Sequence, residues 1–163
     1  MRRAFVFPGQ GSQVVGMGRA LAAASPVARA TFEEVDDALN QKLSALMFDG
    51  PEDALQLTAN AQPAIMALSI AVLRVLESDG FRLADKAAYV AGHSLGEYSA
   101  LCAAGALSLA DTARLLKLRG TAMQAAVPVG VGAMAALLGA SLEQAEAAAR
   151  DAAQGETCNV AND

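Results

Sequence analysis

With 163 residues, of which 54% are hydrophobic, the chain can bury the core of one ordinary domain, and intrinsic disorder is excluded. Its formal net charge is −5, with 17 acidic against 12 basic side chains, and no run of Lys and Arg is interleaved with aromatic residues. A general affinity for nucleic acid is therefore excluded as well.

The predicted elements alternate between strands and helices along the chain. Pro8 and a Gly-rich loop end the first apolar segment, and Ser25, Ser108 and Ser141 are typical caps of helix starts. In chain order, apolar periodicity and these boundaries predict a strand over 5–7, a helix over 27–39, one or two helical turns over 52–57, a helix over 62–78, a strand over 87–91, helices over 98–104 and 109–126, a strand over 132–138, a helix over 142–153 and a strand over 157–160. This order is typical of an α/β fold with a mainly parallel sheet.

Proline and glycine interrupt the apolar pattern at 128–132, which predicts a boundary between two parts. We expect the first part to comprise residues 1–127. The second part, residues 128–163, begins as a predicted strand, helix and strand.

No signal peptide, membrane span or metal site is predicted. The basic start at residues 1–3 precedes an apolar run that Pro8 stops too early for a signal peptide. The apolar stretch 63–73 is too short to cross a bilayer before Arg74. The single histidine, His93, leaves no imidazole cluster for a metal. These features predict a cytoplasmic protein without a membrane partner.

The segment 90–97 carries the most specific motif of the chain. The predicted strand 87–91 leads into Gly92-His93-Ser94-Leu95-Gly96 and then into a predicted helix, which is the setting of a nucleophile elbow. The glycines let the backbone turn sharply, so that the Ser94 hydroxyl stands clear at the start of the helix. The N–H groups that open this helix, including that of Leu95, can stabilise an oxyanion. The alternative is an ordinary turn, because Gly and Ser are common residues.

Arg119 stands out in the predicted helix 109–126. At about 100° per residue it lies about 40° from Leu115 and within the apolar stripe, whereas Arg114 and Lys117 fall on the solvent side. A guanidinium within that stripe needs an acceptor, because an unpaired buried charge is costly. Two interpretations are open. One is an internal salt bridge or a side chain that reaches water, and the other is a fork that awaits a substrate carboxylate.

Three motifs in this order resemble those of a known family. They are Phe7-Pro8-Gly9-Gln10-Gly11-Ser12-Gln13, Gly92-His93-Ser94-Leu95-Gly96-Glu97, and Leu118-Arg119-Gly120 with Met123-Gln124 after it, and the family is the malonyl-CoA:acyl carrier protein transacylases. The resemblance covers the whole chain. It implies a hydrolase-like large subdomain with a parallel sheet and an inserted ferredoxin-like small subdomain. The chain would then hold the first segment of the large subdomain and the first half of the small one.

The resemblance implies roles for four residues. Ser94 matches the serine that carries the malonyl ester, and Arg119 matches the arginine that pairs with the free malonyl carboxylate. The backbone N–H groups of Gln10 and Leu95 match the oxyanion hole. The implied reaction is ping-pong and belongs to fatty acid biosynthesis: the serine takes malonyl from coenzyme A and gives it to the phosphopantetheine thiol of acyl carrier protein. No cofactor is implied, and we expect the intact enzyme to be a monomer.

One catalytic group of the family has no match in this chain. Family members are about twice as long as this chain on the scale of domain sizes, and their catalytic histidine lies beyond position 163. The chain thus resembles an N-terminal portion of the enzyme. His93 precedes Ser94 in the elbow with its side chain directed away from the hydroxyl, so we expect it to steady the turn. We expect residues 1–163 alone to be inactive and to fold poorly.

Two other functions share part of this pattern. A serine esterase or lipase also uses Gly-x-Ser-x-Gly but has little use for an inward Arg119 when its acyl group is neutral. A catalytically silent interaction fragment would account for the missing histidine. For the acyltransferase, an acidic carrier protein needs a local cationic area on this acidic chain, and Arg114 and Lys117 are the candidates.

Overall fold

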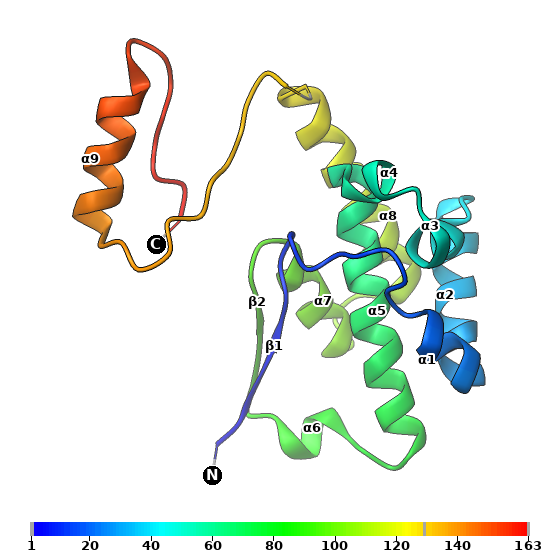
Figure 1. Ribbon diagram of the computed structural model, residues 1–163. Coiled ribbons are helices and arrows are strands. Elements are labelled where there is room, and N and C mark those ends of the chain that lie inside the picture. Colours follow the sequence, from blue (N-terminus) through cyan, green and yellow to red (C-terminus); the bar gives the residue numbers. More distant parts are fainter. Residues whose placement is uncertain (1, 129, 163) are drawn as a thin grey trace. The chain divides into compact units, whose positions relative to one another are not determined.

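A computed structural model describes residues 2–128 and 130–162, which form two compact units on either side of position 129. In chain order, the elements of the first unit are β1 (Ala4–Phe7), α1 (Arg19–Ala24), α2 (Pro26–Leu39), α3 (Leu43–Asp49), α4 (Glu52–Gln56), α5 (Thr58–Ser78), α6 (Leu83–Lys86), β2 (Tyr89–Gly92), α7 (Leu95–Ala103) and α8 (Leu109–Ala126). The second unit contains α9 (Leu142–Ala153), and Figure 1 labels these elements. The assignment of 1–127 and 128–163 to two subdomains stays a prediction, and positions 1, 129 and 163 of these ranges lie outside the described residues.

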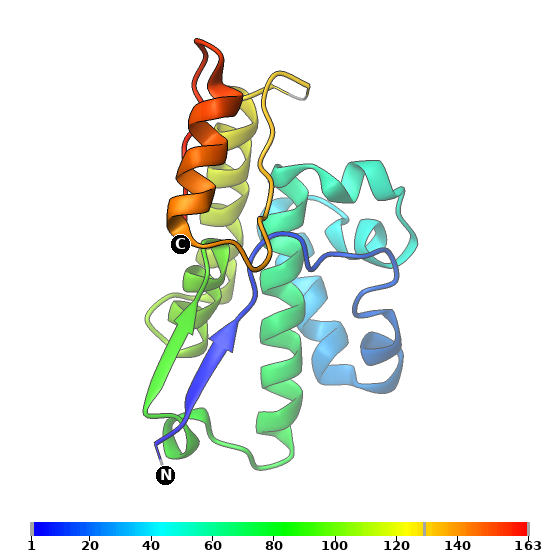
Figure 2. The ribbon, with the colours of Figure 1, turned by 60° about the vertical axis from the view of Figure 1, so that its left-hand side comes forward.

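β1 and β2 form a small parallel sheet, whose two strands lie side by side in Figure 2. Phe5 pairs with Val90, and Phe7 pairs with Gly92. The helix α7 packs against both strands. The predicted α/β class with parallel strands is therefore confirmed, whereas the hydrolase-like and ferredoxin-like assignments stay predictions. Because the two strands are parallel, the segments that follow them leave the same edge of the sheet.

α5 is the core helix of the first unit and packs against α2, α7 and α8. Among the described residues, α5 alone is long and apolar enough to cross a membrane by length and composition, a test that the core helix of a soluble protein also passes. Most of its length is buried inside the unit. The apolar core that surrounds it includes Phe32, Val35, Leu43, Met47, Leu55, Ile65, Met66, Leu95 and Leu116.

The predicted helix starts with serine caps are confirmed. Ser25 and Ser108 each accept a hydrogen bond from a backbone N–H in the first turn of α2 and α8. Ser141 and Gln144 form a capping box at the start of α9. α5 begins at Thr58, earlier than predicted, so Pro63 lies inside the helix rather than near its start.

Two predicted strands are wrong. Within residues 130–162, neither 132–138 nor 157–160 forms a strand, and α9 is the regular element of that unit. A strand must satisfy its backbone N–H and C=O groups through a neighbouring strand, and an apolar pattern does not supply that neighbour. The side chains of Met134 (82% exposed) and Leu138 (94% exposed) accordingly face solvent.

Candidate active site

Ser94 lies at a sharp turn between β2 and α7. Its φ of 53° and ψ of −112° are strained for a residue other than glycine. The flanking glycines are required by close packing: a Cβ on Gly92 would overlap the backbone of Gly96, and a Cβ on Gly96 would overlap the carbonyl oxygen of Phe7. The Gly-x-Ser-x-Gly segment therefore makes the abrupt turn from strand to helix that its sequence predicts, and the Ser94 side chain is exposed.

His93 packs against the loop that follows β1. Its Nδ1 lies 2.7 Å from the position that a Cβ on Gly9 would occupy, and its backbone N–H donates to the Phe7 carbonyl oxygen at 3.4 Å. Within residues 2–128, no hydrogen bond joins the His93 ring to Ser94. This placement agrees with the expectation that His93 steadies the turn.

Arg119 reaches Ser94 from α8. Its Nη2 donates to Ser94 Oγ at 2.9 Å, and its Nη1 donates to Gln62 Oε1 at 2.6 Å. Its Cζ lies 5.9 Å from the centre of the Tyr98 ring, within range of a cation–π interaction. In the part of the chain that the structure describes, no carboxylate lies within salt-bridge distance of Arg119. Its partners are neutral, so the interpretation as an internal salt bridge is wrong for these residues.

The close approach of α8 to α5 puts Arg119 in this position. A Cβ on Gly120 would lie 2.6 Å from the Thr58 carbonyl oxygen, so the two helix backbones come together there. Gln62 lies one turn farther along α5 and is fully buried. Its Nε2 donates to Met123 Sδ at 3.3 Å, which leaves its Oε1 directed at the guanidinium.

The sequence analysis did not single out Gln62 as a site residue. The signal was present: Gln62 is the one amide in the buried stretch 61–67 of α5. A buried amide needs hydrogen-bond partners, and here one partner is a charged side chain.

The buried face of α8 differs from the predicted one. Leu116 is fully buried, whereas Leu115 is 41% exposed and Leu118 is 68% exposed. Arg119 therefore lies at the edge of the buried stripe rather than within it, and half-buried Lys117 lies at the opposite edge. The prediction counted Arg119 within the stripe because the sequence does not show which neighbouring helix α8 faces.

Lys117 was predicted on the solvent side, and this prediction is wrong: its side chain joins an internal network. Its Nζ donates to Gln41 Oε1 at 2.7 Å and to Asn60 Oδ1 at 2.8 Å. Burial lowers the pKa of this amine, because desolvation disfavours its charged form. Lys117 is therefore a poor candidate for docking an acidic partner.

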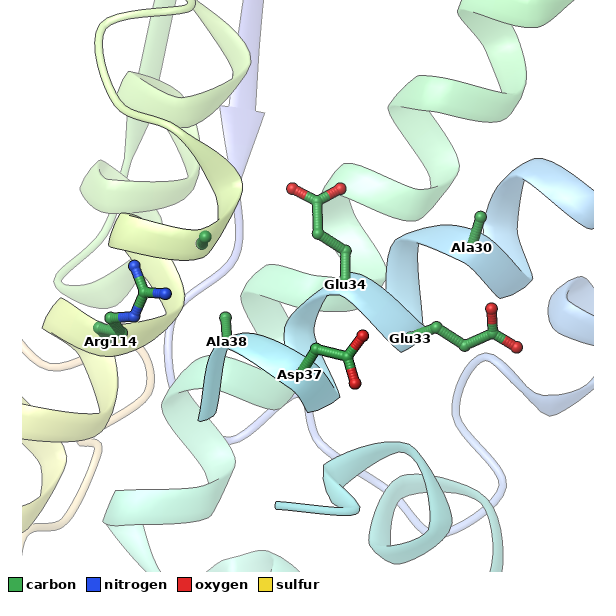
Figure 3. A pocket seen from close by; sticks show the side chains of 7 residues that line it. Ala30, Glu33, Glu34, Asp37, Ala38 and Arg114 are labelled. Carbon is green, nitrogen blue, oxygen red and sulfur yellow. The ribbon is translucent and has the colours of Figure 1, made fainter. Parts of the chain in front are cut away.

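Arg114 is exposed and pairs with Asp111 at 3.1 Å. It borders a hollow of about 500 Å³ between α2 and α8, which Figure 3 shows. Glu33, Glu34 and Asp37 of α2 also line this hollow. An acidic partner would meet these carboxylates beside Arg114, which argues against Arg114 as its docking point.

Two backbone N–H groups near the turn are free to donate a hydrogen bond to a ligand. The N–H groups of Gln10 and Leu95 have no hydrogen-bond partner among residues 2–128 and 130–162. Leu95 is the first residue of α7, where the helix dipole is positive. The Gln10 side chain is anchored instead, since its Nε2 donates to Thr58 Oγ1 at 3.0 Å. The structure thus joins Ser94 and Arg119 directly, and Leu95 follows the serine.

Comparison with known proteins identifies the family. The acyl transferase domain family matches residues 4–162. The chain belongs to this family. The resemblance that the three motifs carried is therefore confirmed.

Relatives of this acyl transferase domain are named malonyl CoA-acyl carrier protein transacylase. That of Bacillus subtilis (strain 168) is 51% identical over 140 residues, which are 86% of this chain and 43% of the relative. That of Escherichia coli (strain K12) is 46% identical over 159 residues, which are 98% of this chain and 50% of the relative. This chain spans about half the length of these relatives.

Solved structures agree with these relatives. The acyl-carrier-protein-S-malonyltransferase from Bartonella henselae is 59% identical with a TM-score of 0.93, over 100% of this chain and 52% of that one. A malonyl-transacylase in complex with its type II PKS acyl-carrier protein is 46% identical with a TM-score of 0.86, over 95% of this chain and 49% of that one.

Proposed function

We propose that this acyl transferase domain moves a malonyl group from coenzyme A to the phosphopantetheine thiol of acyl carrier protein, through a malonyl ester on Ser94. The main support for this proposal is the position of the Arg119 guanidinium. Its Nη2 lies 2.9 Å from Ser94 Oγ, and its partners within the described parts of the chain are neutral. Such a cation suits an acyl group with a free carboxylate. The names of the relatives support malonyl as that group, and the complex with a carrier protein supports the acceptor.

The reaction proceeds in two half-reactions. Ser94 Oγ loses its proton to a base and attacks the thioester carbonyl, and the C–S bond breaks to release coenzyme A. The phosphopantetheine thiol then attacks the Ser94 ester, and the serine oxygen regains a proton. The N–H groups of Gln10 and Leu95 stabilise the oxyanion in both steps. The base is not His93, whose ring packs against Gly9, and the family resemblance assigns it to a histidine beyond position 163.

Arg119 selects the acyl group. A guanidinium has five N–H donors, so Nη1 keeps its bond to Gln62 while Nη2 turns from Ser94 to the malonyl carboxylate. A neutral acetyl group offers no acceptor there and leaves the cation unpaired. No cofactor takes part in this proposal, and the cytoplasmic location and the monomeric state stay predictions.

The test compares malonyl-CoA and acetyl-CoA labelling of Ser94 in the full-length protein, with and without Arg119→Ala. Loss of a charged hydrogen bond worth about 1.5–3 kcal/mol lowers the ratio of malonyl to acetyl labelling about ten- to a hundredfold. Arg114→Ala removes an exposed arginine of the same helix and leaves the ratio unchanged.

If acetyl labelling does not gain relative to malonyl in Arg119→Ala, the anchor role is wrong. Equal labelling by both donors in the unaltered protein favours a serine esterase or lipase instead. Absence of any adduct, with Ser94→Ala as the reference, favours a catalytically silent fragment.

A further inference from the structure

The loop that follows β1 is braced by its own side chains. Ser12 Oγ donates to the Gly9 carbonyl oxygen at 3.0 Å. Gln13 Oε1 accepts the Gly11 N–H at 2.8 Å, and Gln13 Nε2 donates to Gln56 Oε1. Both polar atoms of the Gln13 amide are therefore engaged, one inside the loop and one outside it.

Gln13 differs from its neighbours in burial. It is 9% exposed, whereas Gln10, Gly11 and Ser12 are exposed. Its outer partner, Gln56, is the last residue of α4, and α4 packs against α5. The Gln13 amide thus ties an exposed loop to the helical part of the unit.

These hydrogen bonds fix the direction of the Gln10 N–H. The peptide group between Gly9 and Gln10 is planar and trans, so its C=O and N–H point in opposite directions. The Ser12 bond, which holds the Gly9 C=O, therefore also directs the Gln10 N–H. The Gln13 bond holds the next peptide group through the Gly11 N–H.

The brace acts beside a glycine that adopts a positive φ. Gly11 has a φ of 107°, and a Cβ placed on it would meet no atom within 4 Å. Neither a side chain of its own nor neighbouring atoms restrict Gly11. Without the Ser12 and Gln13 bonds, Gln10 would keep its side-chain bond to Thr58, which does not by itself set the direction of the backbone N–H.

We propose that Ser12 and Gln13 are positioning residues that aim the Gln10 N–H at the oxyanion, with Gln56 as the outer anchor of Gln13. This inference rests on the proposed function, because it requires the Gln10 N–H to stabilise the oxyanion. The two side chains act through the loop backbone. A donor that is held in place before the reaction stabilises the transition state without reorganisation, and a misdirected donor loses this advantage.

The experiment uses the full-length protein, three single variants and the double variant of the two loop positions. Gln13→Leu keeps much of the side-chain volume and removes both hydrogen bonds, and Ser12→Ala removes an exposed hydroxyl with little risk to folding. Gln41→Leu is the matched control, since it removes an amide from the network around Lys117 and leaves the loop intact. The rate of malonyl-Ser94 formation is measured in single turnovers over a range of malonyl-CoA concentrations, and thermal unfolding is measured for each variant.

The expected effect is on the rate at saturation. Removal of a whole oxyanion donor costs about 10²–10³ in rate, so misdirecting it lowers the saturating rate about tenfold or more in Gln13→Leu and by a smaller factor in Ser12→Ala. The half-saturating concentration stays unchanged, because the interaction is made in the transition state. The Ser12→Ala/Gln13→Leu double variant loses less than the product of the single losses, because the two bonds hold adjacent peptide groups of one loop.

Unchanged saturating rates in both loop variants, with normal acylation of the unaltered protein, would overturn the positioning role and leave the proposed function standing. An equal loss in Gln41→Leu would overturn it too. If the unaltered protein forms no malonyl-serine, the proposed function fails. The positioning role is then tested with a fluorophosphonate, which bonds to Ser94 Oγ and releases fluoride, by comparing its rate of reaction among the same variants. If Gln13→Leu does not fold, Ser12→Ala decides the matter.

Discussion

Gln62 is a buried amide whose two polar atoms face different partners. Its Nε2 donates to Met123 Sδ, and its Oε1 accepts from Arg119 Nη1 at 2.6 Å. A hydrogen bond to a charged group contributes about 1.5–3 kcal/mol, and this one orients the guanidinium without neutralising it. Gln62 therefore fixes Arg119 without placing a carboxylate on it.

Replacing Gln62 tests this balance. In Gln62→Leu the guanidinium loses its fixed partner, and we expect kcat/KM for malonyl-CoA to fall about tenfold, the equivalent of 1.4 kcal/mol. Gln62→Glu places a carboxylate on Arg119 that competes with malonyl, so the preference for malonyl-CoA over acetyl-CoA falls further still. Steady-state rates with both donors measure the two effects. A Gln62→Glu protein that keeps the preference would contradict the anchor role of Arg119.

The sequence identified Ser94 and Arg119 because each has a local signal. Ser94 lies in a short motif between a strand and a helix, and Arg119 is a charge near apolar positions of a helix. Gln62 has a weaker signal, as the one amide in the apolar stretch 61–67, and Gln13 has none of its own. Gln62 and Gln13 gain their roles from contacts with residues far away in the chain, which only packing reveals.

At the scale of elements, the crossing of α5 and α8 decides where Arg119 lies. The two backbones approach at Gly120, where a Cβ would lie 2.6 Å from the Thr58 carbonyl oxygen. Backbone atoms cannot move aside as a flexible side chain can. The glycine after Arg119 is thus part of the packing that positions the guanidinium.

We expect Gly120→Ala to separate the two helices and to lower the free energy of unfolding by about 1–3 kcal/mol, the usual effect of an overpacked contact. The exposed neighbour Thr121 is the control, since Thr121→Ala should change stability by less than about 0.5 kcal/mol. Denaturant unfolding of the full-length variants measures both. Equal stability of Gly120→Ala and the unaltered protein would show that the helices adjust without strain.

The predicted helices form, whereas two of the four predicted strands do not, and the short helices α1, α3 and α6 were not predicted. The helix α9 satisfies its backbone within itself and begins at a capping box that four residues encode. The segments 132–138 and 157–160 have apolar residues but no partner strand within 130–162, so no strand forms. β1 and β2 were predictable as strands, but their pairing across the 81 residues between them follows from packing alone.

At the scale of the whole molecule, the first unit leaves apolar sheet residues uncovered. Val6 of β1 is 76% exposed, and Tyr89 of β2 is 60% exposed. Two-stranded sheets have little stability of their own. In the second unit, none of the described residues of α9 is buried.

We therefore expect a polypeptide of residues 1–163 to unfold without a single cooperative transition. Calorimetry should give a van't Hoff enthalpy that differs from the calorimetric enthalpy, and probes of secondary and tertiary structure should report different midpoints. The relative from Escherichia coli (strain K12), half of which this chain spans, is the reference under the same conditions. A two-state transition of the purified 1–163 polypeptide would show that these exposed surfaces do not limit its stability.

The first turns of α5 serve both sides of the serine. Thr58 accepts the bond from the Gln10 side chain and lies beneath Gly120, and Gln62 holds Arg119 one turn later. A chimera that joins α5 of one relative to α8 of another therefore changes the surroundings of the Gln10 loop and of Arg119 together, which are the two parts proposed to bind the oxyanion and the acyl carboxylate. To exchange acyl selectivity between homologues, residues 8–13, 58–62 and 119–120 should be transferred together.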